Sequence, residues 1–445
     1  MKRVLVVSPH FPPTNAADMH RVRQSLPHFA EFGWEPTVLA VSPQSVDGCE
    51  EPLLLDTVSS SIRIIRVTAL PAALTRKVGL GEVGLRSLPF LYRAGAELIR
   101  KSGFSLAYFS TTAFTTLSLG RLWKQRFGLP FVVDMQDPWL SDYYESKPAH
   151  AKPRKYWLSK RLHGTLEPWT MKAVDGLVSV SHDYLTTLQR RYPWLADKPQ
   201  SVLPFGASDL DFDLIRRHPQ PNQFFAKTDT CIRGVYVGRG GKDMELALQI
   251  IFGALRRGLQ TDPELFGQIK LYFIGTDYAT RGRARKTVLP VADSLGVAKY
   301  VQEVPERIPY FEALQLLEDA DFLLVPGSDD VQYTASKIYP YILARKPLLA
   351  IFNERSSVCQ VLRATGAGDL LPFSSGDSAE AHTQPFVQLW ADLLRRLPYS
   401  PQVDWDAFAP YTAREMTKAQ CQLFNRVVSR QPLSLQAGRS IAAAT

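Results

Sequence analysis

Residues 3–41, RVLVVSPHFPPTNAADMHRVRQSLPHFAEFGWEPTVLAV, decide the fold of this chain. Residues 3–8 form a short apolar run that leads into a Pro-rich loop, which is typical of a buried parallel strand and the loop at its carboxyl end. Residues 17–32 place apolar side chains on one face of a predicted helix, and Gly33 suits its C-terminal cap. A second strand is predicted at residues 35–41. Strand, loop, helix and strand in this order predict a βαβ unit.

The alternation of strands and helices continues along the chain and then starts again. In the first series, strands are predicted at residues 106–110, 130–134, 176–181 and 201–204, with a helix at 113–126. Residues 216–230 (RRHPQPNQFFAKTDT) are polar and contain prolines, as in a linker. In the second series, strands are predicted at residues 232–237, 269–274, 300–304, 322–325 and 348–352, with helices at 243–257, 310–318 and 335–344.

These two series predict an α/β protein with two Rossmann-like domains, which agrees with a length of 445 residues. We expect the first domain to span residues 1–215 and the second to span residues 216–408. A last helix, at about residues 409–430, is expected to pack back on the first domain. Residues 431–445 are rich in Ser, Ala and Gln, which predicts a frayed tail.

Composition narrows the class of partner and the compartment. The formal net charge of +9 favours an anionic partner, such as a nucleotide, a phosphorylated lipid or a membrane surface, although it also serves plain solubility. The four cysteines are far apart and form no C-x-x-C pair, which suits reduced thiols in a cytoplasm. No signal peptide and no apolar run of spanning length is evident. We therefore expect a cytoplasmic protein that is soluble or peripheral at the inner face of a membrane.

Two strand-to-helix turns in the second domain are candidates for anion binding. Residues 237–242 (VGRGGK) could bring backbone amides and two cationic side chains to a phosphate. Residues 325–339 (VPGSDDVQYTASKIY) place hydroxyls and Lys337 at the start of a predicted helix. Two such turns in one domain suit a diphosphate. The alternative interpretation is a Gly-rich turn with solvated charges and ordinary helix caps.

In the first domain, two loops follow predicted strands and are expected at the sheet edge where ligands of open α/β sheets bind. Residues 134–139 (DMQDPW) offer two carboxylates and an aromatic ring that could hold a sugar. Residues 10–15 (HFPPTN), with Asp18, His20, Arg21 and Arg23 after them, form the other loop. Asp137 could instead cap a turn, and His20 and Arg21 could be exposed helix residues.

A basic stretch at residues 147–172 combines seven Lys and Arg residues with apolar residues near helical spacing. Such a helix can lie at an anionic membrane surface. It could equally be a surface helix packed on its own domain, and Pro168 should distort it.

Taken together, these parts resemble GT-B glycosyltransferases, specifically the retaining, family-4-like group of bacterial sugar transferases. Residues 11–41 resemble the first βαβ unit of that group, and DMQDPW resembles its Asp-Phe-Arg-Asp-Pro-Trp element, with Gln136 in place of the Arg. The remaining matches are VDGLVSVSHDY (174–184), PELFGQIKLYFIG (263–275), ADFLLVPGSDD (320–330) and SKIYPYILARKPLLAI (336–351).

Two departures from the family pattern stand out. The donor helix of the family usually carries a Glu that holds the ribose hydroxyls, and Pro340 stands at that position here. The first loop has Ala16 and Ala17 where many members carry glycines. The first departure bears on ribose recognition, and the second bears on the space near the acceptor or the donor phosphate.

The resemblance implies a GT-B fold, in which two Rossmann-like domains face each other across a cleft. It also implies transfer of a sugar, with retention, from a nucleoside-diphosphate sugar to a saccharide, lipid-linked or other small acceptor. We expect no metal ion and no cofactor, because cationic groups would stabilise the leaving diphosphate. The predicted catalytic residues are Asp137, Arg239 and Lys242. The predicted donor-binding residues are Gly238, Gly240, Gly241, Gly275, Glu306, Ser336 and Lys337. The predicted acceptor-side residues are Pro12, Pro13, Thr14, His20, Arg21 and Trp139.

Two other functions remain open at this point. One is a nucleotide-sugar epimerase on the same fold, and the other is a non-catalytic, glycosyltransferase-like partner protein, which Pro340 favours. A nucleic-acid binder is disfavoured, because the basic residues are spread over the βα units and form no known binding module.

Overall fold

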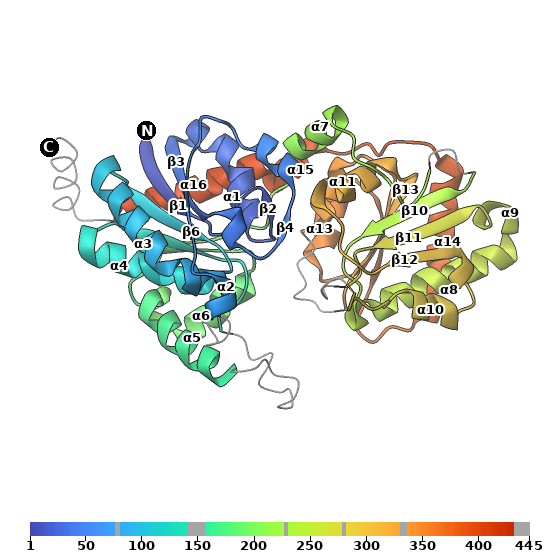
Figure 1. The fold of residues 1–445 in the computed structure, drawn as a ribbon. Helices are drawn as coiled ribbons and strands as arrows, with labels where there is room; N and C mark the ends of the chain where they lie inside the picture. The colour runs from blue at the N-terminus through green and yellow to red at the C-terminus, as the bar shows by residue number, and fades with distance from the viewer. Residues whose placement is uncertain (76–80, 141–155, 227–229, 278–281, 330–335, 431–445) are drawn as a thin grey trace. The chain divides into compact units, whose positions relative to one another are not determined.

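The computed structural model describes residues 1–75, 81–140, 156–226, 230–277, 282–329 and 336–430. The chain forms two compact units, which are coloured from blue to red along the sequence in Figure 1. The N-terminal unit comprises Met1–Gly206 together with Ala413–Thr445, and the C-terminal unit comprises Ala207–Thr412.

The N-terminal unit is built on a seven-stranded sheet with the strand order β5-β3-β1-β6-β7-β8-β9. All neighbouring strands in it are parallel. The strands are β1 (Lys2–Val7), β3 (Trp34–Val41), β5 (Arg63–Val67), β6 (Leu106–Ser110), β7 (Phe131–Met135), β8 (Gly176–Ser179) and β9 (Gln200–Val202). A small antiparallel pair, β2 (Thr14–Asn15) and β4 (Cys49–Glu50), lies in the loops beyond β1 and β3.

Helices cover both faces of this sheet, so its central strands are apolar on both sides. In β1, Leu5 and Val7 belong to one buried cluster, and Val4 and Val6 belong to the other. This arrangement explains why residues 4–7 form a continuous apolar run and do not alternate with polar residues. The helices of the unit are α1 (Met19–Ser25), α2 (Ala72–Thr75), α3 (Val83–Ser102), α4 (Ser118–Phe127), α5 (Tyr156–Met171), α6 (His182–Arg191) and α16 (Ala413–Ser429).

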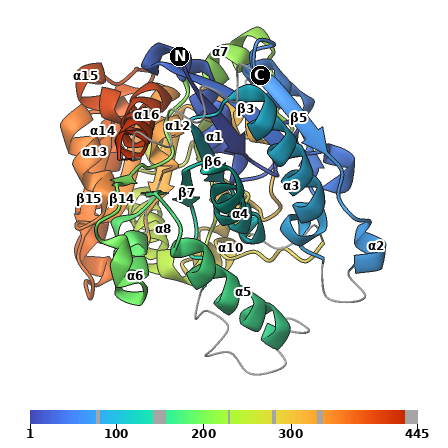
Figure 2. The same ribbon diagram turned by 90° about the vertical axis from the view of Figure 1, so that its left-hand side faces the viewer.

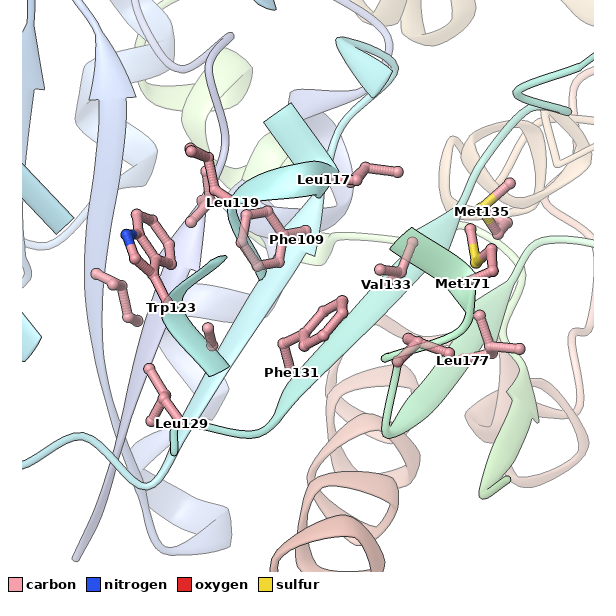
Figure 3. Packing of buried hydrophobic residues seen from close by; sticks show 14 of the residues in the cluster. Phe109, Leu117, Leu119, Trp123, Leu129, Phe131, Val133, Met135, Met171 and Leu177 are labelled. Atoms are coloured by element: carbon pink, nitrogen blue, oxygen red, sulfur yellow. The ribbon is translucent and has the colours of Figure 1, made fainter. Parts of the chain in front are cut away.

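On the α3 and α4 face, aromatic rings fill the core between helices and strands. Trp123 of α4 stacks on Phe109 of β6 with ring centroids 5.7 Å apart, and Phe131 of β7 packs edge-on against Phe109 (Figure 3). A Cβ atom on Gly95 of α3 would lie 2.2 Å from the ring of Trp123. The close approach of α3 and α4, seen from a second side in Figure 2, therefore requires glycine at this position.

The opposite face is closed by α1 and by α16, which comes from the far end of the chain. Phe424 of α16 packs against Phe29, Trp34 and Tyr108. The predicted helix over residues 17–32 is shorter than expected: α1 ends at Ser25, and two 3-10 segments follow it. Pro27 accounts for the break, because it lacks the N–H that a continuing α-helix needs. Gly33 caps the end with φ of 80°, as predicted.

The C-terminal unit contains a second parallel sheet, of six strands, with the order β12-β11-β10-β13-β14-β15. Its strands are β10 (Ile232–Val237), β11 (Ile269–Ile274), β12 (Val301–Val304), β13 (Phe322–Pro326), β14 (Leu348–Asn353) and β15 (Asp369–Phe373). Its helices are α7 (Asp209–Arg217), α8 (Glu245–Thr261), α9 (Pro263–Phe266), α10 (Leu289–Ser294), α11 (Tyr310–Asp319), α12 (Ile338–Leu343), α13 (Ser357–Thr365), α14 (Ala379–Arg396) and α15 (Trp405–Phe408). The predicted fold class, with two Rossmann-like α/β domains, is confirmed by the two parallel sheets.

The unit boundary differs from the expected one at residue 215. Helix α7 belongs to the C-terminal unit, because Tyr310 donates a 2.7 Å hydrogen bond to Asp211 and Arg216 pairs with Glu318 at 2.8 Å. The polar stretch at 216–230 was expected as the linker, but its described part up to residue 226 packs on the same unit, as the contact of Phe225 with Tyr272 shows. The chain therefore passes between units at residues 206–207 and again at residues 412–413.

None of the described helices has the length and apolar character that crossing a bilayer requires.

Candidate functional site

In the N-terminal unit, three loops meet at the carboxyl ends of the neighbouring strands β1, β6 and β7. His10, in the loop after β1, directs Nδ1 at the carboxylate of Asp18, with 2.8 Å to Oδ2. The same Asp18 oxygen accepts hydrogen bonds from the Thr111 hydroxyl at 2.8 Å and from the Thr112 amide at 2.9 Å. Asp18 is 3% exposed, so its carboxylate is a fixed, buried partner of the imidazole.

This pairing changes the protonation of both groups. Burial alone would lower the pKa of His10, but the hydrogen bond and charge of Asp18, together with the charge of Glu82, outweigh it and raise that pKa. Burial would raise the pKa of Asp18, but the hydrogen bond and charge of His10 and the donors of the β6 loop bring it below its ordinary value. The pair therefore favours a charged imidazolium beside a carboxylate.

Two further carboxyl groups lie around the pair. Glu82, directly before α3, accepts a 3.2 Å hydrogen bond from Thr115 and lies 3.8 Å from Nε2 of His163 on α5. Burial raises the pKa of Glu82. Asp137 is exposed as a whole residue, yet desolvation of its carboxyl group and the charge of Asp18 raise its pKa. This end of the sheet thus gathers carboxyl groups and one imidazole, His10, whose pKa values are shifted by burial and by neighbouring charges, which is typical of functional sites.

Beneath these loops, a buried polar network holds the site. Arg21 and Asp134 form an ion pair of 2.7 Å, and both side chains are fully buried. Gln136 donates from Nε2 to the Asp134 carboxylate, to Ser110 and to the backbone carbonyl of Asp18. Gln136, which replaces the Arg of the family element, therefore links the ion pair to the Asp18 loop.

Arg21 and Trp139 cannot serve as acceptor contacts in the way that the sequence suggested. Arg21 donates to the carbonyl of Leu203, and its guanidinium lies over the ring of Phe205, so it joins the loop after β9 to α1. The ring of Trp139 is 6% exposed because it stacks on Phe114 and donates a 2.8 Å hydrogen bond to His163. A buried ring cannot stack on a sugar.

The other predicted acceptor-side residues also make local contacts. Pro12 is buried, and its carbonyl accepts a hydrogen bond from Arg66. Thr14 is buried in the pairing of β2 with β4, and the carbonyl of Pro13 accepts from the Glu51 amide. His20 is only partly buried and lies 3.1 Å from Arg23.

In the C-terminal unit, two amides of the Gly-rich turn after β10 are not free, in contrast to what was expected. The amide of Gly238 donates to Ile274, and the amide of Gly240 donates to Thr276, so both are used within the unit. The glycines are required for space: a Cβ on Gly240 would lie 2.4 Å from the Thr287 hydroxyl, and one on Gly241 would lie 2.4 Å from Asp243. Contacts with the side chains of Thr287 and Asp243 therefore account for glycine at these two positions.

Gly275 is the exception among them, because it has φ of 74° and so adopts the left-handed backbone that favours glycine. Its amide also donates within the sheet, to the carbonyl of Val304. It turns the chain beside Glu306 and Arg307, in the loop after β12. Glu306 is partly buried there.

The cations of the same turn are in different environments. Arg239 is paired with Asp243 through two hydrogen bonds, of 2.8 and 2.6 Å, and Asp243 also accepts from the Ser328 hydroxyl at 2.6 Å. Lys242 is exposed. A ligand anion would therefore share Arg239 with Asp243, whereas Lys242 lies at the surface.

Lys337 lies against this turn from another loop. A Cβ on Gly238 would be 3.0 Å from the Lys337 ammonium, so the glycine leaves room for it. Burial, together with the positive charges of Arg239 and Arg307, lowers the pKa of Lys337 to about 8. Ser336 beside it is partly buried. Three cationic groups from three different loops thus act on one another at the carboxyl ends of the strands.

Helix α12 explains how Pro340 is tolerated. The helix begins at Ile338, with Lys337 at the N-cap, so Pro340 is its third residue. The amide missing at this position would have no partner within the helix anyway. The predicted start between residues 336 and 338 is confirmed. The earlier part of this predicted helix, residue 335, lies outside the described residues.

Sequence reasoning did not select the pair of His10 and Asp18, although both residues lie in the loop that it singled out. A signal was available, since His10 follows β1 with only Ser8 and Pro9 between them. The pairing depends on Thr111 and Thr112, which are about a hundred residues further along the chain. Within the described part of the chain, no group of three or more His, Cys, Asp or Glu residues could hold a metal ion.

Comparison with known proteins agrees with this architecture. Residues 20–206 match the glycosyl transferase 4-like domain. No curated protein matches the chain. HepE of Anabaena, solved with UDP and glucose, is 14% identical with a TM-score of 0.56, and the match covers 96% of this chain and 100% of HepE.

Two more solved structures share the fold. A glycosyltransferase of Rickettsia africae is 14% identical with a TM-score of 0.55, covering 97% of this chain and 99% of that one. The UDP-GlcNAc 2-epimerase of Methanocaldococcus jannaschii is 10% identical with a TM-score of 0.50, covering 96% and 100%. The predicted resemblance is confirmed in these two respects: the chain has the GT-B fold, and residues 20–206 of its N-terminal unit match a glycosyl transferase 4-like domain.

Proposed function

We propose that this glycosyltransferase moves a sugar from a nucleoside-diphosphate sugar to a saccharide, lipid-linked or other small acceptor, with retention of configuration and without a metal ion. The observation that carries the donor assignment is the burial of the Lys337 side chain beside the positive charges of Arg239 and Arg307. When cationic side chains lie close together and are shielded from water, a bound anion stabilises their charged forms. A diphosphate has the charge and the size to contact several of them.

The same cations account for the proposed chemistry. As the bond between the sugar and the diphosphate breaks, negative charge develops on the leaving group. Lys337, Arg239 and Arg307 would stabilise that charge, which is the task of a divalent cation in other transferases. Ser336 and Glu306 are proposed to bind elsewhere on the donor, and exposed Lys242 is proposed to contribute long-range attraction.

The acceptor is proposed to bind the N-terminal unit at the carboxyl ends of β1, β6 and β7. Asp137 is the predicted residue that stays exposed there, and it is proposed to accept a hydrogen bond from an acceptor hydroxyl. HepE, which shares the fold, has been solved with UDP and glucose, and this supports the choice of a nucleoside-diphosphate sugar as donor.

A lipid-linked acceptor would bring the protein to a membrane surface. On α5, Trp157 is 67% exposed, and Lys160 and Arg161 are exposed close to it in sequence. An exposed indole beside cationic side chains suits the interface of an anionic bilayer. The basic residues 147–155 of this stretch lie outside the described residues.

The donor assignment is tested by thermal unfolding in the presence of UDP, GDP, dTDP and ADP, each with and without EDTA. At least one nucleotide is expected to raise the midpoint, and EDTA is expected to leave the shift intact. Lys337→Met should abolish the shift. Lys299→Met is the matched control, because Lys299 is exposed at the amino end of β12. No shift with any nucleotide would contradict the proposal and favour a non-catalytic partner protein.

Turnover decides between transfer and epimerisation, the alternative that the fold of the Methanocaldococcus jannaschii enzyme keeps open. The nucleotide sugar of the best nucleotide is incubated with a panel of saccharide acceptors and followed by NMR of the anomeric proton. A glycoside with the configuration of the donor is expected. An inverted glycoside would contradict retention, and a C2 epimer formed without any acceptor would replace transfer by epimerisation.

A further inference from the structure

We propose that Asp243 is a positioning residue for the donor diphosphate: together with Ser328 it fixes the guanidinium of Arg239, and donor affinity depends on it although Asp243 is itself an anion. This inference rests on the proposed function and adds to it a residue outside the predicted site. The residues that carry it all belong to the C-terminal unit.

Asp243 binds Arg239 through both oxygens of its carboxylate. Arg239 donates from Nη1 to Oδ1 at 2.8 Å and from Nη2 to Oδ2 at 2.6 Å. Two parallel hydrogen bonds fix the plane of a guanidinium as well as its distance. The two side chains are 20% and 29% exposed, so water and salt screen this pair less than a surface pair. The hydrogen bonds from Arg239 hold the pKa of Asp243 below its ordinary value although burial opposes them, so the carboxylate is ionised at neutral pH.

The loop after β13 fixes Asp243 in turn. Its Oδ2 accepts a 2.6 Å hydrogen bond from the hydroxyl of Ser328, which is 2% exposed. Its backbone carbonyl accepts from the Asp329 amide at 2.8 Å. Because Asp243 is held at both its side chain and its backbone, it sets the position of the Arg239 guanidinium.

The backbone of the turn that carries Arg239 is held by two tyrosines. The Tyr236 hydroxyl donates to the carbonyl of Arg239 at 2.8 Å. The Tyr341 hydroxyl accepts from the amide of Val237 at 2.7 Å and donates to its carbonyl at 3.0 Å. With its backbone and the end of its side chain both held, Arg239 loses little rotamer freedom when an anion binds. Preorganisation of this kind raises affinity without a new contact.

Gly241 leaves the space that the pair occupies. A Cβ at this position would lie 2.4 Å from Oδ1 of Asp243 and 2.7 Å from Nη1 of Arg239. The φ of Gly241 is −166°, which is extended backbone that any residue adopts, so the backbone conformation does not require glycine. Glycine at this position therefore serves the pair of Arg239 and Asp243.

Arg239 connects the pair to the other cations of the candidate donor site. The Lys337 ammonium would lie 3.0 Å from a Cβ on Gly238, and burial and then the charge of Arg239 lower the pKa of Lys337. A guanidinium carries five N–H groups and the pair with Asp243 uses two of them, so an anion can bind Arg239 without breaking the pair. Asp243 therefore supports the cation that a diphosphate binds and does not compete with the diphosphate.

Two simpler roles for Asp243 predict different results. If Asp243 were only a carboxylate close to an anion site, its removal would make the site more positive and would tighten the binding of a diphosphate. If Asp243 only tied two loops together, its removal would lower stability and weaken every part of the ligand alike. The positioning role predicts weaker binding of the diphosphate in particular, and only while Arg239 is present.

The experiment titrates UDP, by calorimetry, and uridine, by ligand-observed NMR, into wild type, Asp243→Asn, Arg239→Met and the double variant. Where another nucleoside diphosphate stabilises wild type more than UDP, that nucleotide and its nucleoside are used. The control is Asp392→Asn on α14, which makes the same substitution in an exposed pair: Asp392 is 68% exposed and lies 3.6 Å from Arg395. Thermal unfolding without ligand checks that each variant is folded.

Asp243→Asn is expected to weaken UDP binding by about 10-fold to 100-fold, as when the outer partner of a charged ligand group is removed, and to leave uridine binding unchanged. Arg239→Met should weaken UDP binding at least as much. Adding Asp243→Asn to Arg239→Met should cause no further loss, because a residue that acts through Arg239 has no effect without it. Asp392→Asn should bind UDP as wild type does.

Gly241→Ala is a second test, which decides the question if Asp243→Asn does not fold. It keeps every charged group and crowds the pair, and the atoms that it meets are the ends of side chains that can move. The variant should therefore keep a thermal midpoint near that of wild type and bind UDP more weakly.

Three results would each overturn the positioning role and leave the donor assignment standing. These are tighter UDP binding by Asp243→Asn, equal losses for UDP and uridine, and a loss from Asp243→Asn that is just as large in the Arg239→Met background. Unchanged UDP affinity in Gly241→Ala would also count against it. Failure of wild type to bind any of the nucleoside diphosphates would overturn the proposed function and this inference together.

Discussion

Arg21 and Asp134 form an ion pair of 2.7 Å in which neither side chain has any exposed surface. A buried charge that loses its partner keeps its desolvation penalty, so removing one member is costly. We expect Asp134→Asn and Arg21→Met each to lower the free energy of unfolding of the N-terminal unit by about 3–5 kcal/mol. Urea unfolding followed by tryptophan fluorescence measures this change.

The matched control is Arg3→Ala, which breaks the exposed pair with Glu35, whose side chains are 50% and 56% exposed. Exposed pairs contribute about 0–1 kcal/mol. A loss from Asp134→Asn no larger than that from Arg3→Ala would contradict the view that this pair holds the loops of the candidate site.

The pattern of apolar runs was sufficient to predict both sheets, because buried parallel strands need apolar residues on both faces, as Val4 to Val7 show. It was insufficient for the site. Arg21 looks like an exposed helix residue in sequence, and its burial depends on Asp134 and Leu203, which lie far along the chain. Likewise, Gly240 looks like part of a phosphate turn, but the group that demands glycine there is Thr287. Long-range contacts of this kind leave no local signal.

The pair of His10 and Asp18 should make stability depend on pH in two windows. The pKa of His10 is raised on folding, so its contribution is fully present below about pH 6.5 and is lost as pH rises through the folded pKa. The pKa of Asp18 is lowered, so its contribution is present above the unfolded pKa of about 3.9 and is lost as pH falls through the folded value. The pair therefore stabilises most between these two limits.

His10→Gln should accordingly destabilise the protein more at pH 5.5 than at pH 8.5, measured as the difference in unfolding midpoint from wild type. His28→Gln serves as the comparison, because burial lowers the pKa of His28 and its pH dependence has the opposite sign. A penalty for His10→Gln that grows with pH would contradict the pairing.

Lys337 should take up a proton when a diphosphate binds. Its pKa of about 8 means that a large share of the amines is neutral in the free protein near pH 8. A bound diphosphate favours the charged ammonium, so binding of UDP at pH 8 should draw protons from the buffer. Titration calorimetry in two buffers of different ionisation enthalpy measures this uptake. Lys337→Met should remove it and Lys299→Met should keep it, and equal apparent enthalpies in both buffers for wild type would refute the assignment.

Helix α5 should bind anionic vesicles through exposed residues if the acceptor is lipid-linked. Replacing Trp157, Lys160 and Arg161 by Ala should weaken co-sedimentation with vesicles that contain phosphatidylglycerol, and salt should weaken the binding of wild type, because the charges are exposed. The control is Arg256→Ala with Arg257→Ala, two exposed cations on α8. Binding that is unaffected by salt, or absent, would assign the exposed face of α5 no role at a membrane.

Pro340→Glu tests the position where the family pattern breaks. The resemblance places at this position a carboxylate that holds the ribose hydroxyls of the donor, and Pro340 is a partly buried residue in the first turn of α12. Replacing it should not disturb the helix, because the amide that Glu restores needs no partner there and an acidic side chain suits a helix N-terminus.

If only the ribose contact is missing, Pro340→Glu should bind UDP about 5-fold to 100-fold more tightly than wild type, the gain of one to two charge-assisted hydrogen bonds. Pro340→Ala is the control that removes the ring without adding a carboxylate, and it should leave the affinity near that of wild type. Equal affinities of the Glu and Ala variants for UDP would mean that other residues hold the ribose. Glu306→Gln would then be the first variant to measure. Failure of all three proteins to bind UDP, GDP, dTDP or ADP would instead favour the partner protein over the enzyme.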